Sequence, residues 1–190
     1  NDVKLPCIYS YAFDHWGFYN GKTSNTTTLP TIQPLLQLGI PAHSNKDIDT
    51  TYTQCGILKS IQYPTGGTTN FEYEYNRTDT IVGGLRVKKI MHVDSVANKS
   101  ITKEFEYKNS AGQSSGQVLF NPVLFYNYHS MDQYGGYPVY RIHGDAISPL
   151  FPNQGSPVLY TQVLEKITGP DGDIRIRHYM TGFDAYSSTI

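Results

Sequence analysis

The chain has 190 residues, of which 15 are Lys or Arg and 16 are Asp or Glu, so that its formal net charge is −1. Strand-favouring Val, Ile, Thr, Tyr, Phe and Trp make up about 36% of the residues, against about 26% for helix-favouring Ala, Leu, Glu, Lys, Gln, Met and Arg. This composition excludes a helix bundle and predicts an all-β fold. The near-neutral charge disfavours nucleic acid as a partner, and no apolar run is long enough for a transmembrane segment.

The first part of the chain, residues 1–54, is expected to be an irregular N-terminal segment. Its most aromatic stretch is DHWGFYNG (Asp14–Gly21), which holds the single tryptophan of the sequence. Trp16 and Tyr19 are weak candidates for ligand-binding residues, because an exposed ring can stack on a sugar or a peptide. Cys7 and Cys55 match no metal or redox spacing; they could pair, although two small buried side chains are the favoured interpretation.

Hairpin patterns begin at residue 55. A strand is predicted over 58–63, a turn over Pro64–Gly67 and a second strand over 68–75, since two adjacent glycines supply the positive φ angles of a tight hairpin. In FEYEY (Phe71–Tyr75) aromatic and acidic residues alternate. This alternation predicts a strand with its rings on a buried inner face and its glutamates in solvent.

The same pattern recurs along the chain. The remaining predicted strands lie at 85–93 and 101–107 for a second copy, at 159–168 and 174–180 for a looser third copy, and at 118–128 and 137–143 between them. We therefore predict a curved antiparallel sheet of repeated β-hairpins over residues 55–190, within a single β-rich domain that spans residues 1–190. Because one hairpin cannot bury its apolar face alone, each copy is expected to lie beside its neighbours, in a piece of a longer chain.

Candidate catalytic residues are few. The GQSSG stretch around Ser114 fits the GxSxG pattern, but a strand-like segment follows it where a nucleophile elbow needs a helix, so a loop is the favoured interpretation. Glu72 and Glu74 lie two apart on one strand face, as do Glu104 and Glu106, at roughly the 7 Å separation that suits the acid and base of a glycosidase. A solvated face, paired with lysines on neighbouring strands, explains these glutamates better.

Metal ligands are also weakly indicated. Histidines with a nearby aspartate occur as Asp14–His15, His129 with Asp132, and His143 with Asp145. None of these pairs has the spacing of a metal site. Asp171 and Asp173 could supply oxygen ligands to calcium, but the hairpin turn in which they lie explains them better. We therefore expect no metal ion, no cofactor and no catalytic residue in this chain.

Tyrosine is in clear excess, with 16 residues in 190. Its large ring and polar hydroxyl suit the inside of a β-repeat as well as a sugar- or peptide-binding surface. The regular alternation of the FEY rings favours the first of these uses.

Three stretches carry a resemblance to a known family. They are DHWGFYNGK (14–22), GILKSIQYPTGGTTNFEYEYN with GGLRVKKI (56–76 and 83–90), and LYTQVLEKI with GPDGDIRIRHYMTGFD (159–167 and 169–184). Together they resemble the large RHS/YD-repeat-like proteins of Bacteroidetes, most strongly over residues 56–107. The resemblance implies a long secreted or cell-surface protein whose repeats coil into a β-sheet shell, and it assigns no catalytic residue.

The predicted function is therefore a non-catalytic structural, encapsulating or surface-interaction module of a larger RHS-like protein. The expected partners are neighbouring repeats of the same parent chain, together with an enclosed toxin domain or a surface glycan. The alternative is a carbohydrate- or peptide-binding module that uses exposed aromatic side chains, and a hydrolase is the least favoured of the three.

Overall fold

The computed structural model describes residues 5–30, 37, 39–40, 43–118, 126–129, 139–142 and 156–181. The chain divides into two compact units. Unit 1 comprises Asn1–Cys55 and Phe120–Gly155, and unit 2 comprises Gly56–Leu119 and Ser156–Ile190. The described elements are ten strands and one short 3-10 helix, η1 (Tyr52–Gln54), so the all-β prediction is confirmed.

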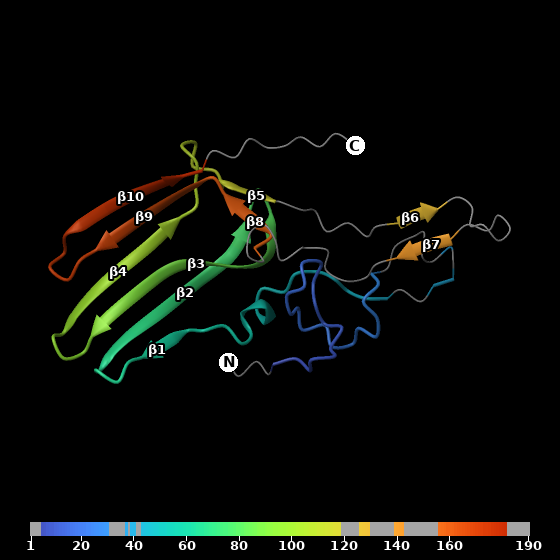
Figure 1. Cartoon of the computed structure of the whole chain (residues 1–190), viewed down its shortest axis with the longest axis horizontal. Helices are drawn as coiled ribbons and strands as arrows, with labels where there is room; N and C mark the ends of the chain where they lie inside the picture. Colours follow the sequence, from blue (N-terminus) through green and yellow to red (C-terminus); the bar gives the residue numbers. More distant parts are fainter. Residues whose placement is uncertain are drawn as a thin grey trace. The chain divides into compact units, whose positions relative to one another are not determined.

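Unit 2 is built on a six-stranded antiparallel sheet with the strand order β1–β2–β3–β4–β9–β10 (Figure 1). Its strands are β1 (Ser60–Gln62), β2 (Gly67–Arg77), β3 (Ile81–Asp94), β4 (Lys99–Glu106), β9 (Gln162–Thr168) and β10 (Ile174–Met180). A separate two-stranded sheet pairs β5 (Gly116–Val118) with β8 (Val158–Tyr160). The main sheet thus combines the hairpins β1–β2, β3–β4 and β9–β10, and their origin as copies of one repeat stays a prediction.

The hairpin turns lie where the glycines predict them. The Tyr63 N–H donates to the Gly67 carbonyl (2.8 Å), and the Gly66 N–H donates to the Tyr63 carbonyl (3.0 Å). In the β9–β10 turn, the Gly172 N–H donates to the Gly169 carbonyl (3.1 Å). Gly66 and Gly172 have φ angles of 91° and 84°, a conformation that strains any residue with a Cβ atom.

The strand expected over 159–168 is divided in the structure. It breaks at Thr161, whose N–H donates to the Ser115 carbonyl (3.1 Å), while the Ser115 hydroxyl donates to the Gln162 carbonyl (2.5 Å). These bonds fasten the chain to the β5 segment at the point where it turns. As a result β8 pairs with β5 and β9 joins the main sheet, so the prediction of one continuous strand is wrong.

The two strands expected between the second and third copies are only partly visible. In the range 118–128 the structure shows the end of β5 and then β6 (Tyr126–His129), and residues 119–125 lie outside its description. β6 pairs antiparallel with β7 (Val139–Ile142), which lies inside the range expected at 137–143. β6 and β7 belong to unit 1.

The aromatic rings of the main sheet are not fully buried. Phe71 and Tyr73 stack on one face with 6.3 Å between their ring centroids, but both are half-buried, as is Phe105 on β4. Of the aliphatic, aromatic and proline residues described in unit 2, only Val82, Pro157 and Val158 are fully buried. The prediction of a shared ring face therefore holds for Phe71 and Tyr73, and the prediction that this face is buried is wrong.

Polar side chains hold the described part of unit 1 together. The buried Asn20 amide donates to the carbonyls of Asn45 (3.0 Å) and Asp47 (3.1 Å). The buried Asn25 side chain donates to the Asn45 carbonyl (3.0 Å) and accepts from the Asn45 N–H (2.9 Å). Both side-chain amides bond the backbone around Asn45, and neither of the segments that they connect is a strand. These hydrogen bonds therefore fix the path of the chain there.

The two cysteines lie in unit 1. Cys7 is exposed and Cys55 is half-buried, and no disulfide joins them. The favoured interpretation of two small buried side chains is therefore wrong, most clearly for Cys7.

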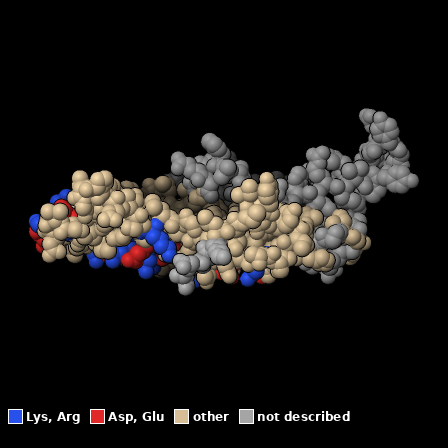
Figure 2. Space-filling view, turned by 90° about the horizontal axis from the view of Figure 1, so that it is seen from below, with Lys and Arg blue, Asp and Glu red and all other residues tan. Residues whose placement is uncertain are grey.

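One face of the molecule is largely uncharged on its described residues. Figure 2 shows basic and acidic side chains beside one another, with uncharged residues over most of the face in view. No helix in the described part of the chain has the length and apolar character needed to cross a membrane.

Candidate functional site

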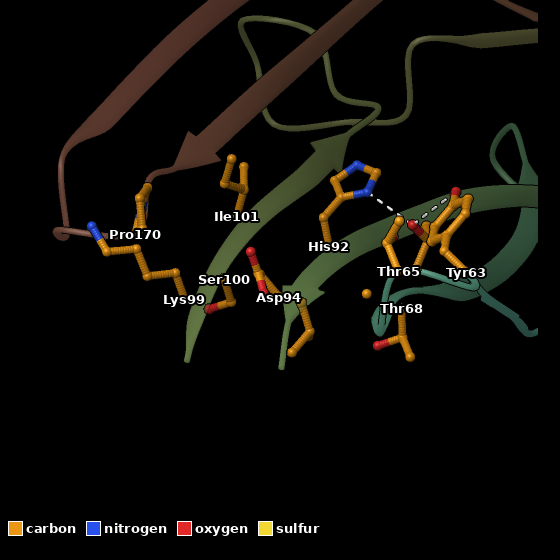
Figure 3. A pocket seen from close by; sticks show the side chains of 12 residues that line it. Tyr63, Thr65, Thr68, His92, Asp94, Lys99, Ser100, Ile101 and Pro170 are labelled. Carbon is orange, nitrogen blue, oxygen red and sulfur yellow. Dashed lines mark hydrogen bonds between the residues drawn. The ribbon is translucent and has the colours of Figure 1, made fainter. Parts of the chain in front are cut away.

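A groove with a volume of about 600 Å³ lies at one end of the main sheet of unit 2. The β1–β2, β3–β4 and β9–β10 turns share this end of the sheet (Figure 1), and all three hairpins contribute to the lining (Figure 3). The residues that matter for its chemistry are Tyr63, Thr69, His92, Lys99, Ser100 and Pro170. A groove of this volume falls in the range of small-molecule sites.

Thr69 is the centre of the polar contacts in the groove. The strand register places Thr69 of β2 directly opposite His92 of β3, with 3.0 Å between Thr69 Oγ1 and His92 Nδ1. The Thr69 hydroxyl also donates to Tyr63 Oη over 3.3 Å, and Thr69 is only 3% exposed. Either Thr69 Oγ1 or His92 Nδ1 supplies the proton of this bond, according to the tautomer of His92.

The charged residues at the rim are engaged with the turns. Lys99 Nζ lies 3.4 Å from Asp171 Oδ1, which connects the start of β4 to the β9–β10 turn. Asp94 Oδ1 accepts hydrogen bonds from the N–H groups of Val96 (2.9 Å) and Ala97 (3.0 Å) and so orders the β3–β4 turn. Hydroxyl groups and one imidazole in the groove are therefore more available to a ligand than Lys99 and Asp94, which already have partners.

The arrangement suits hydrogen bonding to a neutral polar ligand. The Tyr63 ring is 44% exposed and gives the groove an apolar wall. The described residues contain no group of three or more His, Cys, Asp or Glu that could hold a metal ion. On chemical grounds the groove is a binding surface in which Tyr63, Thr69 and His92 form one connected unit.

Sequence reasoning missed this groove, although one signal was present. Thr69 shares a strand face with Phe71 and Tyr73, so a small polar residue occupies a position where the pattern places a ring. Such a position marks a gap on an aromatic face. Its pairing with His92 depends on the β2–β3 register, which the local pattern does not specify.

Ser114 does not lie in a nucleophile elbow. Its hydroxyl donates to the Arg77 carbonyl (2.7 Å), and its backbone forms an isolated bridge with Lys108. Strand β5, and not a helix, begins at Gly116, where a Cβ atom would overlap the Arg77 carbonyl oxygen. The interpretation as a loop is confirmed, and Ser114 fastens this loop to the end of β2.

The glutamates of β2 and β4 have cationic neighbours. The ion pairs are Glu74–Arg86 (2.8 Å), Glu104–Lys89 (3.8 Å) and Glu106–Lys108 (3.9 Å). Glu72 is exposed and lies opposite Lys89 in the β2–β3 register. The prediction of a cross-strand lysine partner is confirmed at Lys89, and Arg86 is a partner that the sequence pattern did not indicate.

The aspartates of the β9–β10 turn lie beside cations. Asp171 pairs with Lys99, and Asp173 Oδ2 lies 3.6 Å from Arg175 Nε. The side chains of His129, Asp132, His143 and Asp145 lie outside the part of the chain that the structure describes. The hairpin turn predicted at Asp171 and Asp173 is confirmed.

The DHWG sequence forms a turn around a buried carboxylate. Asp14 Oδ1 accepts hydrogen bonds from the N–H groups of Trp16 and Phe18, both at 2.9 Å. Asp14 has no exposed surface, and its Oδ2 atom has no hydrogen-bond partner among the described residues. Burial raises the pKa of Asp14 to about 6, although the N–H groups and the nearby Lys46 act in the opposite direction. Sequence reasoning considered Asp14 only as a neighbour of His15 and missed its role at the centre of this turn.

The two ligand-binding candidates, Trp16 and Tyr19, are half-buried in the same segment. Trp16 contacts the His15 ring edge-on, with 6.3 Å between ring centroids. Tyr19 contacts Tyr52 in the same manner at 5.5 Å. Both rings thus have a packing role within unit 1, and their role in ligand binding stays a prediction.

Comparison with known proteins adds no relative to this description. No protein-family model, no curated protein and no solved structure matches the chain.

Proposed function

We propose that the chain is a non-catalytic structural module of a larger protein, in which neighbouring parts complete the sheet of unit 2. The observation that carries this proposal is the scarcity of burial. Among the described aliphatic, aromatic and proline residues of unit 2 only Val82, Pro157 and Val158 are fully buried, whereas Ile101, Ile176 and Met180 are 41%, 56% and 73% exposed. Sheets gain stability by burying apolar surface, at about 25 cal/mol per Å², so a sheet this open gains from being covered.

We place this module in a secreted or cell-surface protein of the RHS/YD-repeat-like kind, with neighbouring repeats as its partners and a toxin domain or a surface glycan as its cargo or ligand. The resemblance over residues 56–107 supports this proposal, as does the succession of hairpins in the main sheet. The non-catalytic role is supported by Ser114, whose hydroxyl is bonded to a backbone carbonyl, and by the cations that pair with the glutamates.

Hydroxyl-radical footprinting of the chain alone and of its longer parent protein tests this proposal. The reporters are Phe71, Tyr73 and Phe105, which are half-buried on the main sheet. We expect their oxidation to fall severalfold in the parent, because neighbouring parts cover the sheet there, with rates normalised to those of the unfolded proteins. Equal oxidation of these residues in the two proteins would contradict the proposal.

The groove favours a second candidate, the binding of a carbohydrate or a peptide. The observation behind it is the exposed Tyr63 ring beside the connected hydroxyl and imidazole of Thr69 and His92. Titration with neutral oligosaccharides and short peptides, followed by NMR, should shift the amide signals of β2 and β3 near the groove. Tyr63→Ala should abolish the shifts and Tyr9→Ala, at a ring that is 82% exposed in unit 1, should preserve them. Unchanged groove signals with every probe would exclude this candidate.

A further inference from the structure

The strand β10 is an open edge of the main sheet in the described part of the chain. All seven of its residues pair with β9 on one side, and all seven are exposed. Ile174, Ile176 and Met180 share one face of the strand with His178, and all three are more than half exposed. An edge strand with free backbone groups and an apolar row is a template for the addition of another strand.

Charge follows a regular pattern across this sheet. Ion pairs connect each pair of neighbouring strands from β2 to β10: Glu74–Arg86 (2.8 Å), Lys89–Glu104 (3.8 Å), Lys103–Glu165 (4.0 Å) and Glu165–Arg177 (3.8 Å). On β10 itself Arg175 and Arg177 are 74% and 59% exposed. Each guanidinium has five N–H donors, so both can donate hydrogen bonds to a further carboxylate. The pattern of the sheet therefore predicts acidic residues on the strand that follows β10.

We propose that β10 binds an extended segment in which acidic residues alternate with large apolar residues. Arg175 and Arg177 are two residues apart and need two acidic residues at the same spacing, while Ile174 and Ile176 need apolar residues between and beside them. A segment of about seven residues would cover the whole of β10, at roughly 3.3 Å per residue. The segment that binds β10 is thus defined by its negative charges and by their alternation with apolar residues.

The chain itself contains a segment of this kind in β2. In an antiparallel pairing, FEYEY places Glu72 opposite Arg177 and Glu74 opposite Arg175 when Tyr73 lies opposite Ile176. In the observed sheet the same segment already pairs with β3, a strand with basic and apolar residues like those of β10. The acidic–aromatic strand is therefore a natural neighbour for a basic–apolar strand in this fold.

The opposite edge of a second, folded copy does not fit this description. That edge is β1, Ser60–Gln62, which has three residues and no acidic side chain. We therefore assign β10 to a strand of the acidic–aromatic kind from a neighbouring unit of the parent protein. This assignment rests on the proposed structural function and names the partner that completes one edge of the sheet.

A synthetic peptide of residues 68–77, TTNFEYEYNR, tests the pairing with the full chain. We expect it to protect the backbone amides of β10 from hydrogen exchange, and the E72K/E74K peptide to bind at least tenfold more weakly. The chain with R175E/R177E should reverse this preference, because the two charge patterns are then exchanged. Equal binding of both peptides, or protection that leaves out β10, would overturn the proposal.

Two N-methylated forms of the peptide distinguish strand addition from attraction between charges. Methyl groups on one alternate set of backbone nitrogens should abolish binding, because that set faces β10, and methyl groups on the other set should preserve it. If both forms bind equally, no ladder forms and the proposal fails, and this holds even if R175E/R177E does not fold. Footprinting protection in the parent without peptide binding would overturn this edge assignment and leave the structural function standing.

Discussion

Replacing Asp14 with Asn should remove a pH dependence from the stability of unit 1. The pKa of Asp14 is about 6 in the folded chain, against 3.8 for an ordinary Asp, and its first cause is burial of the carboxylate. Between these two values the folded chain keeps the proton and the unfolded chain has released it, so stability is full below pH 4 and is lost as the pH rises to about 6. At about 1.4 kcal/mol per pKa unit, the loss amounts to about 3 kcal/mol.

The change retains the bonds that hold the turn. In Asp14→Asn the amide oxygen can still accept from the N–H groups of Trp16 and Phe18, while the amide nitrogen replaces Oδ2, an atom with no partner among the described residues. The neutral side chain cannot titrate. From pH 4 to pH 7 the stability of Asp14→Asn should therefore rise by about 3 kcal/mol relative to the original chain.

The assay is urea unfolding at pH 4, 5, 6 and 7, followed by the fluorescence of Trp16, the single tryptophan. His15, whose pKa is lowered chiefly by burial, contributes to the curves of both proteins and cancels in their difference. Asp47→Asn is the matched control, since Asp47 is an exposed carboxylate of the same unit. If the stabilities of the original chain and Asp14→Asn run parallel across this pH range, the argument from burial is refuted.

Four further substitutions test the packing of unit 2 by chemical unfolding. Gly116→Ala should lower the free energy of unfolding by about 1–3 kcal/mol, because the added methyl group overlaps the end of β2, and an unchanged midpoint would show that the backbone moves aside. Glu165→Ala should lower the free energy of unfolding by about 1–3 kcal/mol, since this carboxylate is 5% exposed and accepts a 2.7 Å hydrogen bond from Tyr179. Tyr179→Phe should lower it by about 1 kcal/mol. A larger loss in Tyr179→Phe than in Glu165→Ala would contradict the assignment of Glu165 as the buried group that needs its partners. Lys99→Ala should change stability by less than about 0.5 kcal/mol, because its pair with Asp171 lies in solvent, and a larger loss would mean that this pair orders the turns.

The hairpins could be predicted because their signals are local. Gly66 and, likewise, Gly172 after Asp171 specify turns through the backbone angles that only glycine adopts easily. The alternation in FEYEY specifies a strand and assigns its rings to one face, as the stacking of Phe71 on Tyr73 shows. Each of these signals spans fewer than about ten residues, the range over which a hairpin is determined by its own sequence.

Long-range contacts could not be predicted in this way. The division of the 159–168 strand depends on hydrogen bonds between Thr161 and Ser115, which are distant in sequence. The groove depends on the β2–β3 register that places Thr69 opposite His92. The extent of burial failed as well, because alternation shows which residues share a face and cannot show whether anything covers that face.

The pairing of β5 with β8 has a consequence for how the chain can vary. Gly116 lies opposite Tyr160 and Val118 opposite Val158, so the chain leaves and re-enters unit 2 at neighbouring points. The segment between β5 and β8 is therefore a long connection whose two ends are held together by this strand pairing. Closing a longer loop costs only about 0.6 kcal/mol for each doubling of its length. Unit 2 could thus accept a connection of different length or sequence between β5 and β8. This position is therefore a natural point for inserting or exchanging a segment.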